Sequence, residues 1–270
     1  MTIPNLEKEI IYNDADHTYI RVRDEKLLAG VSSVSALATS RESGGFLKQW
    51  AVNEAIEFIK NNSEKIDDDE EAIYYNVSEY TLNESKYAHK EKGKEATDIG
   101  TQIHAILEDY VKAKMFGSDI VIPENEITRL FRDEFLKWEK ENNVDWVASE
   151  LLVGDPEKLE LAGRLDALAF VNGILTIIDF KVANTVPPTY YIQLAGYAIC
   201  LEAMGIEAKD SLIIRLPKSE KKKFWDEESH KYKMVDNIIE FINPPTDINW
   251  DKEVFVKLRE VYKWINHYYK

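Results

Sequence analysis

Hydrophobic and polar residues follow two different periods along this chain, and the pattern predicts strands as well as helices. Ile99, Ile103, Ile106 and Tyr110 recur at helical spacing and predict one buried helix face. The helices expected from such patterns span 45–61, 70–93, 95–116, 124–142, 188–205 and 250–269. The expected strands lie within 9–37, around a turn at 13–16, and at 146–153, 160–184 and 211–216. Residues 64–71 are expected to form an acidic loop or helix start, and 218–243 a charged loop followed by a strand or hairpin. This order predicts an α/β (α+β) fold in which helices flank a central mixed β-sheet and extra helices are inserted before it.

The segment 160–184 predicts a tight β-hairpin. Asn172-Gly173 is a preferred dipeptide of two-residue hairpin loops, because both loop residues need a positive φ. With this loop, Val171 pairs with Ile174, and Asp166 pairs with Asp179. Like charges directly across a strand pair are destabilising, and a divalent cation between the two carboxylates would compensate them.

Two cationic side chains are expected beside these acids. Strand residues two apart face the same side, so Lys181 accompanies Asp179 and Arg164 accompanies Asp166. Carboxylate oxygens on a rigid hairpin suit Mg²⁺ or Mn²⁺. A structural ion-pair cluster without a catalytic role is the alternative.

Composition limits the class of protein. The chain has 270 residues, of which 44% are hydrophobic and 31% charged, and this suits a large globular domain. Its one cysteine, Cys200, excludes a disulfide framework or a cysteine-ligated cluster. The N-terminal residues lack an apolar signal core and no run is long enough to span a membrane, so we expect a soluble, cytoplasmic protein. The net charge of −15 argues against a nonspecific DNA-coating protein but not against a DNA enzyme. Two lysine clusters, within 86–94 and 218–223, are either solvated surface or phosphate contacts.

Four further residues are candidates for the same site. His104 lies at the edge of the apolar face of its helix, where a packed structural histidine is the alternative. Glu150 lies in an apolar strand and faces either solvent or the acidic pair. Gln193 and Tyr197 are four residues apart and share one helix face, either as an ordinary polar face or as support for the site.

In this order the motifs resemble the PD-(D/E)XK nuclease superfamily, specifically its RecB-like and phage-type exonuclease branch. The resemblance rests on Gly100-Thr-Gln-Ile-His104, Glu150, Gly163-Arg-Leu-Asp166, Asp179-Phe-Lys181 and Gln193-Leu-Ala-Gly-Tyr197. It covers about 100 residues directly, and each motif is weak alone while the ordered set is specific.

The resemblance implies a role for each residue. It implies that His104, Asp166 and Asp179 bind the metal together with the main-chain carbonyl of Phe180, and that Lys181 assists the attacking water. The catalytic residues so implied are Lys181, Asp166, Asp179 and Glu150, and the substrate-binding residues are Gln193, Tyr197 and Arg164. Asp179 replaces the more frequent Glu, and the four cluster-binding cysteines of some relatives are absent.

The same resemblance implies a restriction-endonuclease-like fold and a function. We expect a single nuclease domain over 1–270, with an N-terminal elaboration at 1–95, the core at 96–217 and a C-terminal strand and helix at 218–270. The expected activity is that of a Mg²⁺- or Mn²⁺-dependent DNA exonuclease in phage or bacterial recombination or repair. DNA is the expected partner, no membrane is expected, and a single-strand annealing or recombination protein and the oligomeric state are left open. A noncatalytic nucleic-acid-binding recombination module and a hydrolase of small phosphoesters are the alternatives.

Overall fold

The computed structural model describes the chain except residues 1, 39–40, 69–72, 119, 227–230 and 269–270. It divides into two compact units, one made of 1–39 and 102–270 and the other of 40–101. The expected assignment of a nuclease core to 96–217 stays a prediction. Within the described residues, no helix combines the length and the apolar character that a membrane span requires.

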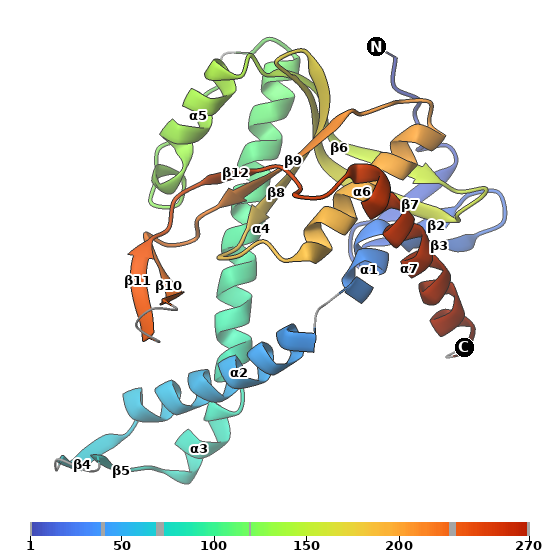
Figure 1. The fold of residues 1–270 in the computed structure, drawn as a ribbon. Coiled ribbons are helices and arrows are strands. Elements are labelled where there is room, and N and C mark those ends of the chain that lie inside the picture. The colour runs from blue at the N-terminus through green and yellow to red at the C-terminus, as the bar shows by residue number, and fades with distance from the viewer. Residues whose placement is uncertain (1, 39–40, 69–72, 119, 227–230, 269–270) are drawn as a thin grey trace. The chain divides into compact units, whose positions relative to one another are not determined.

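The larger unit is built on a mixed sheet, as the sequence predicted. In the described part of the chain, this sheet has eight strands, and seven of them follow the order β1-β2-β3-β7-β8-β9-β12 while β6 pairs with β7 (Figure 1). The strands are β1 (Ile10–Asn13), β2 (Thr18–Arg21), β3 (Lys26–Gly30), β6 (Asp145–Asp155), β7 (Leu161–Val171), β8 (Ile174–Val182), β9 (Asp210–Leu216) and β12 (Glu240–Ile242). A separate hairpin, β10 (Lys221–Asp226) with β11 (Lys231–Asp236), lies within the region where a hairpin was expected.

The hairpin of β7 and β8 has the predicted register. Asn172 and Gly173 have φ values of 49° and 82°, as the tight loop requires. Val171 pairs with Ile174, and the register runs unbroken to Ala167 and Ile178.

Strand β7 has one partner along its first edge and two along its second. On the first edge, β6 pairs with it antiparallel from Leu161 to Phe170. On the second edge, β3 pairs in parallel with 161–162, and β8 pairs antiparallel with 167–171. Residues 163–166 lie between these two pairings, so the sheet forks there. We call this opening the β7 fork.

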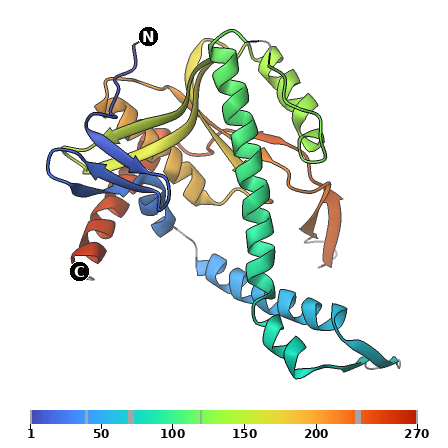
Figure 2. The same cartoon turned by 180° about the vertical axis from the view of Figure 1, so that it is seen from behind.

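Helices cover both faces of the sheet (Figures 1 and 2). Helices α1 (Val31–Ser35), α6 (Pro188–Ala203) and α7 (Ile248–Tyr268) contribute to one core cluster, which includes Val31, Leu194 and Phe255. The part of helix α4 (Ala88–Met115) that belongs to this unit, from Gln102 on, runs along the face that is turned forward in Figure 2, with the short η2 (Thr128–Leu130) and α5 (Arg132–Glu141) following it.

The buried stripe of α4 differs from the predicted one at Leu107, which replaces Ile106, and at Val111, which is added. Ile103, Leu107, Tyr110 and Val111 are buried, whereas Ile106 is only half-buried. The prediction that Ile103 and Tyr110 are core residues is confirmed. Leu107 replaces Ile106 because a core face at i, i+4, i+7 and i+8 suits the 3.6-residue period equally well.

The smaller unit contains α2, a short hairpin and the first part of α4. Its elements are α2 (Arg41–Asn61), β4 (Glu64–Asp68), β5 (Ile73–Asn76) and α3 (Glu79–Ser85). The helix expected at 45–61 is confirmed. The expected loop or helix start at 64–71 is wrong over 64–68, and the expected helix at 70–93 is wrong over 73–76, because β4 and β5 pair antiparallel and satisfy each other's backbone groups. Residues 69–72 lie outside the described part of the chain. Helix α3 begins only after Ser78, whose hydroxyl accepts a hydrogen bond from the backbone N–H of Thr81 at 3.0 Å.

Candidate functional site

Asp166 lies at the β7 fork and binds the next strand through its side chain. Continued past Ala167 and Ile178, the register would place Asp166 opposite Asp179. Instead, the backbone N–H of Phe180 donates a hydrogen bond to Asp166 Oδ2 at 2.7 Å. The carboxylate therefore takes the place of a main-chain carbonyl as the acceptor at this point. The backbone N–H of Phe180 stays hydrogen-bonded where the two strands separate.

Asp179 and Lys181 form a buried ion pair on β8. Lys181 Nζ lies 2.9 Å from Asp179 Oδ1 and 2.7 Å from Oδ2. The Asp179 side chain is 1% exposed and that of Lys181 17%. The short Nζ–Oδ2 contact is an ion pair without hydrogen-bond geometry, so Oδ2 is a buried oxygen that accepts no hydrogen bond.

The pair shifts the ionisation of both groups. Burial raises the pKa of Asp179 above its usual value, although Lys181 opposes the rise, and nearby Asp166 adds to it. Burial alone would lower the pKa of Lys181, but the charges of Asp179 and Asp166 outweigh burial and raise it. Mutual influence of this kind requires the two carboxylates and the ammonium group to share one neighbourhood.

His104 approaches the same fork from α4. Its Nδ1 lies 3.8 Å from Asp166 Oδ2, and its ring meets the ring of Phe180 edge-on at 6.4 Å between centroids. Phe180 faces α4, so its neighbours Asp179 and Lys181 face the other side of the sheet. There the Lys181 ammonium lies 5.1 Å from the ring centroid of Tyr190 on α6. The candidate groups thus reach the fork from both faces of the sheet, with Asp166 between them.

Gln193 and Tyr197 on α6 connect this helix to the fork. Gln193 Nε2 donates to Tyr197 Oη at 2.9 Å, and Tyr197 Oη donates to the carbonyl of Arg164 at 2.9 Å. Arg164 lies in the stretch of β7 that has no strand partner on its second edge, so the tyrosine hydroxyl satisfies a carbonyl that the fork would leave unpaired. The two α6 side chains therefore share a face, and their contacts fix the strand that carries Asp166.

Glu150 and Arg164 form an ion pair next to the fork. Arg164 Nε lies 2.9 Å from Glu150 Oε2. The β6–β7 register places Glu150 opposite Asp166, and its φ of 50° marks an irregular point on β6. Burial, followed by the charge of Asp166, raises the pKa of Glu150 to about 7 despite the nearby guanidinium. Glu150 is therefore oriented toward Asp166 and Arg164 rather than toward solvent.

Three neighbours of these residues were not predicted. Glu108, one turn after His104 on α4, contributes to raising the Glu150 pKa. Tyr12 lies against the Arg164 guanidinium at 5.2 Å, and Tyr190 lies against Lys181. Only Glu108 could have been predicted from the sequence, because it lies four residues after His104 on the same helix face. The two tyrosines reach the site through tertiary packing, which the sequence pattern does not show.

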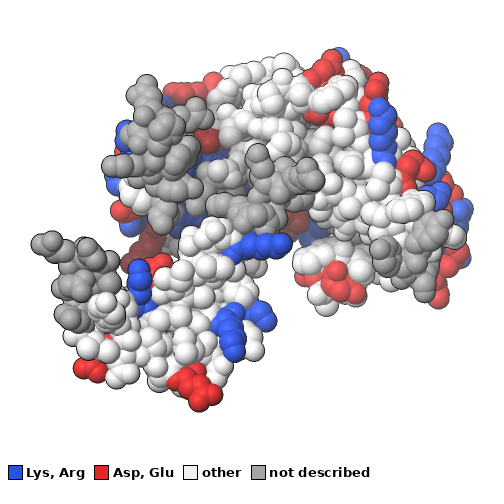
Figure 3. All heavy atoms as spheres, turned by 60° about the horizontal axis from the view of Figure 1, so that its bottom comes forward, with Lys and Arg blue, Asp and Glu red and all other residues white. Residues whose placement is uncertain are grey.

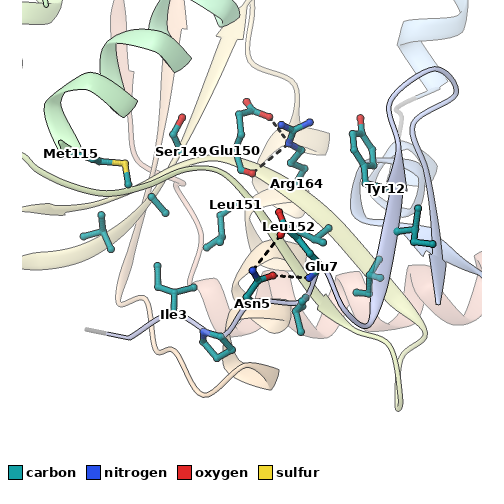
Figure 4. Close-up of a pocket in the computed structure, with 16 residues that line it drawn as sticks. Ile3, Asn5, Glu7, Tyr12, Met115, Ser149, Glu150, Leu151, Leu152 and Arg164 are labelled. Atoms are coloured by element: carbon teal, nitrogen blue, oxygen red, sulfur yellow. Dashed lines mark hydrogen bonds and ion pairs between the residues drawn. The ribbon is translucent and has the colours of Figure 1, made fainter. Parts of the chain in front are cut away.

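Glu150 and Arg164 also form one wall of a cavity of about 680 Å³ (Figure 4). Figure 4 shows them joined at one side of the cavity, with Tyr12 beyond Arg164 and Met115 at the opposite end. Leu151 and Leu152 of β6 and Ile3 and Asn5 of the N-terminal segment complete it. Neither Asp166 nor Asp179 lines this cavity, whose wall combines apolar side chains with the charged Glu7, Glu150 and Arg164.

The donor set has the chemistry of a hard-metal site, but its side chains do not converge on one point. Within the described residues, no group of three or more His, Cys, Asp and Glu side chains is arranged to hold a metal ion. The reason is the orientation of Asp179, whose carboxylate turns to Lys181, while Asp166 is engaged by Phe180. Two carboxylates and an imidazole still fit Mg²⁺ or Mn²⁺ by ligand type, and Asp179 Oδ2, which is ion-paired with Lys181 but accepts no hydrogen bond, is an oxygen that a cation could use.

Two solved structures are distantly similar to this chain. One is described as the crystal structure of LHK-Exo in complex with dAMP, with 12% identity, a TM-score of 0.28, and coverage of 64% of this chain and 89% of the other. Another, the crystal structure of SSO0001, has 15% identity, a TM-score of 0.24, and coverage of 47% and 53%. No curated protein sequence matches this chain.

The sequence also matches a family model over residues 121–258, just over half of the chain, and the description of that family is the PD-(D/E)XK nuclease superfamily. The matched region contains Glu150, Asp166, Asp179 and Lys181 in the order described above, while His104 precedes it. Nucleases of this superfamily generally use divalent metal ions, and membership supports a nuclease function on a nucleic-acid substrate. The chain belongs to the PD-(D/E)XK nuclease superfamily.

Proposed function

We propose that this chain is a divalent-metal-dependent deoxyribonuclease that hydrolyses phosphodiester bonds from DNA ends. The observation that supports it is the meeting of Asp166, Asp179, Lys181 and His104 at the β7 fork. Phage or bacterial DNA recombination or repair is the proposed setting, with a single-strand annealing or recombination protein as a further partner. Exonuclease action and this setting rest on the resemblance of the motifs.

The proposed ligands of Mg²⁺ or Mn²⁺ are His104, Asp166 and Asp179, with the carbonyl of Phe180. When bound, the ion would activate a water molecule and neutralise charge on the scissile phosphate. To ligate it, Asp179 has to share its carboxylate with the ion, and Oδ2 is the oxygen that accepts no hydrogen bond.

Lys181 supplies a fixed positive charge beside the proposed ligands. Its raised pKa keeps it protonated near neutral pH, so it would orient the water by hydrogen bonding and stabilise negative charge on the phosphate. Tyr190 and Asp179 hold the ammonium in place.

Arg164 and Glu150 are proposed to act on the substrate side of the fork. The guanidinium suits a phosphate oxygen, and Glu150 holds it near Asp166. Gln193 and Tyr197 are proposed to support the site by fixing the carbonyl of Arg164.

The surface charge agrees with local rather than general DNA binding. On the face shown in Figure 3, Lys and Arg side chains form small groups separated by uncharged and acidic ones. With a net charge of −15, binding would depend on cations near the site rather than on a broad basic field.

The test is a cleavage assay with end-labelled single-stranded and double-stranded DNA, with and without Mg²⁺. We expect stepwise loss of linear DNA only with the metal, while a covalently closed circle of the same sequence resists. Cleavage of the circle would contradict the exonuclease mode alone. No cleavage of any DNA or RNA substrate with Mg²⁺ or Mn²⁺ would overturn the proposed function.

Lys181→Ala is the decisive variant, and Lys158→Ala is its matched control because Lys158 is an exposed lysine on the same unit. Lys181→Ala should lower the cleavage rate by about a hundredfold or more, as loss of a preorganised charge does. Calorimetry with Mn²⁺ should show binding retained in Lys181→Ala and weakened in Asp166→Asn. Full activity of Lys181→Ala would show that the ion pair is structural.

A further inference from the structure

The lysine-rich stretch 86–94 of the smaller unit contains positive charge that the chain does not compensate. Four of its nine residues are lysines, and all four are exposed. Lys86 Nζ donates to the amide oxygen of Asn83 at 2.9 Å, and the Lys90 ammonium lies 5.1 Å from the ring centroid of Tyr87. The groups that hold these two lysines are neutral, so the charge stays available to a ligand.

Lys90 and Lys94 lie on a side of α4 that is turned away from α2. They are four residues apart on the helix, so their side chains are neighbours. The side that meets α2 carries His89, whose ring meets the ring of Trp50 edge-on at 6.3 Å between centroids, and Gly93, where a Cβ would lie 3.9 Å from Trp50. Successive helix residues are turned by about 100°, so the two lysines point away from this contact into solvent.

Helix stability gives no reason for this arrangement. Like charges four residues apart destabilise a helix, and Lys90 also lies in the first turn of α4, where the helix dipole disfavours a cation. Glu91 and Asp98 are within helical reach, but in the part of the chain that the structure describes neither Lys90 nor Lys94 forms an ion pair with a carboxylate. An anion from outside the chain would relieve the repulsion between the two ammonium groups.

The second lysine cluster, within 218–223, differs because carboxylates of the chain neutralise it. Lys221 Nζ lies 2.6 Å from Asp236 Oδ1, and Lys222 Nζ lies 3.1 Å from Glu240 Oε1. The sequence leaves both clusters open as solvated surface or phosphate contacts. These ion pairs favour the first cluster over the second as a phosphate contact.

Tyr87 adds an aromatic ring to the uncompensated lysines. It is 53% exposed, follows Lys86 directly in the sequence and lies under the ammonium of Lys90. Surfaces that bind single-stranded nucleic acid combine the same two elements, because bases stack on the ring while the cations contact phosphates. The chain belongs to a superfamily of nucleases, so a nucleic acid is the polyanion that this surface would meet.

We propose that Lys86, Tyr87, Lys90 and Lys94 form a binding surface for single-stranded DNA. The lysines contact phosphates, and Tyr87 stacks on a base. The inference rests on the proposed function in taking DNA as the ligand, and it adds a contact made by none of the residues proposed for cleavage. The chain should therefore hold a single strand even when cleavage is prevented.

The test is fluorescence anisotropy of a labelled oligothymidylate with EDTA present, so that binding is measured without cleavage. The variant replaces three lysines with glutamine, Lys86→Gln, Lys90→Gln and Lys94→Gln, and it should bind at least about tenfold more weakly in low salt. The slope of log Kd against log salt concentration should fall by about 2, because each phosphate contact on a single strand contributes about 0.7.

The matched control replaces three exposed lysines of the larger unit, Lys158, Lys209 and Lys257, with glutamine and changes the net charge equally. It should leave the affinity and the slope unchanged. Equal weakening in both triple variants would be an effect of net charge and would overturn the proposal. Binding by the first triple variant that matches the unmodified chain, or no binding by the unmodified chain in low salt, would overturn it as well. Circular dichroism establishes that both variants are folded, and Lys90→Gln alone takes the place of the first triple variant if that one is not.

The role of the aromatic ring is tested separately. Tyr87→Ala should weaken binding of the oligothymidylate at least about fivefold, and Tyr87→Phe should bind like the unmodified chain, because stacking needs the ring and not the hydroxyl. A blunt duplex of the same length should bind Tyr87→Ala and the unmodified chain equally, because its bases are not free to stack. Equal losses for the single strand and the duplex would overturn the assignment to single strands.

The two proposals fail in different ways. A chain that shows these binding differences but cleaves no nucleic acid with Mg²⁺ or Mn²⁺ would retain the surface and lose the proposed function. A chain that cleaves DNA while the first triple variant binds the oligothymidylate normally would retain the function and lose the surface.

Discussion

Gly163→Ala tests whether the β7 fork depends on close packing behind the site. Gly163 begins the segment that ends at Asp166, and it has no strand partner on the fork side. A Cβ at this position would lie 2.8 Å from Tyr197 Cε1 and 2.9 Å from Val31 Cγ2. Carbon atoms pack at about 3.5–4.0 Å, so both neighbours would have to move.

The expected cost follows from the rigidity of those neighbours. Tyr197 and Val31 are both buried, and the tyrosine hydroxyl is held by the carbonyl of Arg164. Overpacking of this kind costs about 1–3 kcal/mol of unfolding free energy. Displacement of Tyr197 would also free the carbonyl of Arg164, so we expect nuclease activity to fall together with stability.

The assay is urea unfolding and DNA cleavage by Gly163→Ala and by a control, Gly93→Ala. A Cβ on Gly93 would lie 3.9 Å from Trp50, an ordinary contact, and alanine in a helix interior is expected to gain about 0.5–1 kcal/mol. Adding Val31→Ala to Gly163→Ala should cost at least about 0.5 kcal/mol less than the sum of the two single changes. An unfolding free energy of Gly163→Ala within about 0.5 kcal/mol of the unmodified chain, or strict additivity, would refute the reasoning.

Three other changes have definite expected outcomes. Arg215→Met should lower the unfolding free energy by about 3 kcal/mol or more in urea titration, because Arg215 is fully buried and its loss removes the hydrogen bonds that it donates to Glu240 Oε2 and to the carbonyl of Ala183. Arg129→Ala should change it by less than about 0.5 kcal/mol in the same titration, since its ion pair with a glutamate is exposed on both sides. Tyr197→Phe should cost about 1–1.5 kcal/mol and reduce cleavage, which thermal unfolding and the end-labelled DNA assay would measure.

The local structure of the hairpin could be predicted because two residues determine it. The dipeptide at 172–173 sets the loop length, and the loop length sets every pairing from Val171 to Ala167. The alternation of side chains then follows from the strand period. For the same reason, Lys181 and Asp179 could be expected on one face of β8, as the structure has them.

The β7 fork could not be predicted, because it depends on a partner strand far away in the sequence. Strand β3 takes up the second edge of β7 at 161–162, and nothing in the hairpin indicates where β8 must separate from it. The contact of the Asp166 carboxylate with the N–H of Phe180 is a consequence of that separation. Glu150 is a similar case, since its positive φ arises where β6 departs from regular geometry.

The buried pair on β8 links stability to the proposed chemistry more tightly than the sequence indicates. The structure shows Asp179 at 1% exposure with Lys181 as its ion-pair partner. Removing the lysine leaves a buried carboxylate unpaired, at a cost of up to about 3–5 kcal/mol unless Asp179 takes up a proton. A divalent ion bound through Asp179 would replace the missing charge, so Lys181→Ala should be stabilised by Mn²⁺ more strongly than the unmodified chain is. Thermal unfolding of both proteins with and without Mn²⁺ measures that difference, and an equal shift in the two would show that Asp179 does not hold the ion.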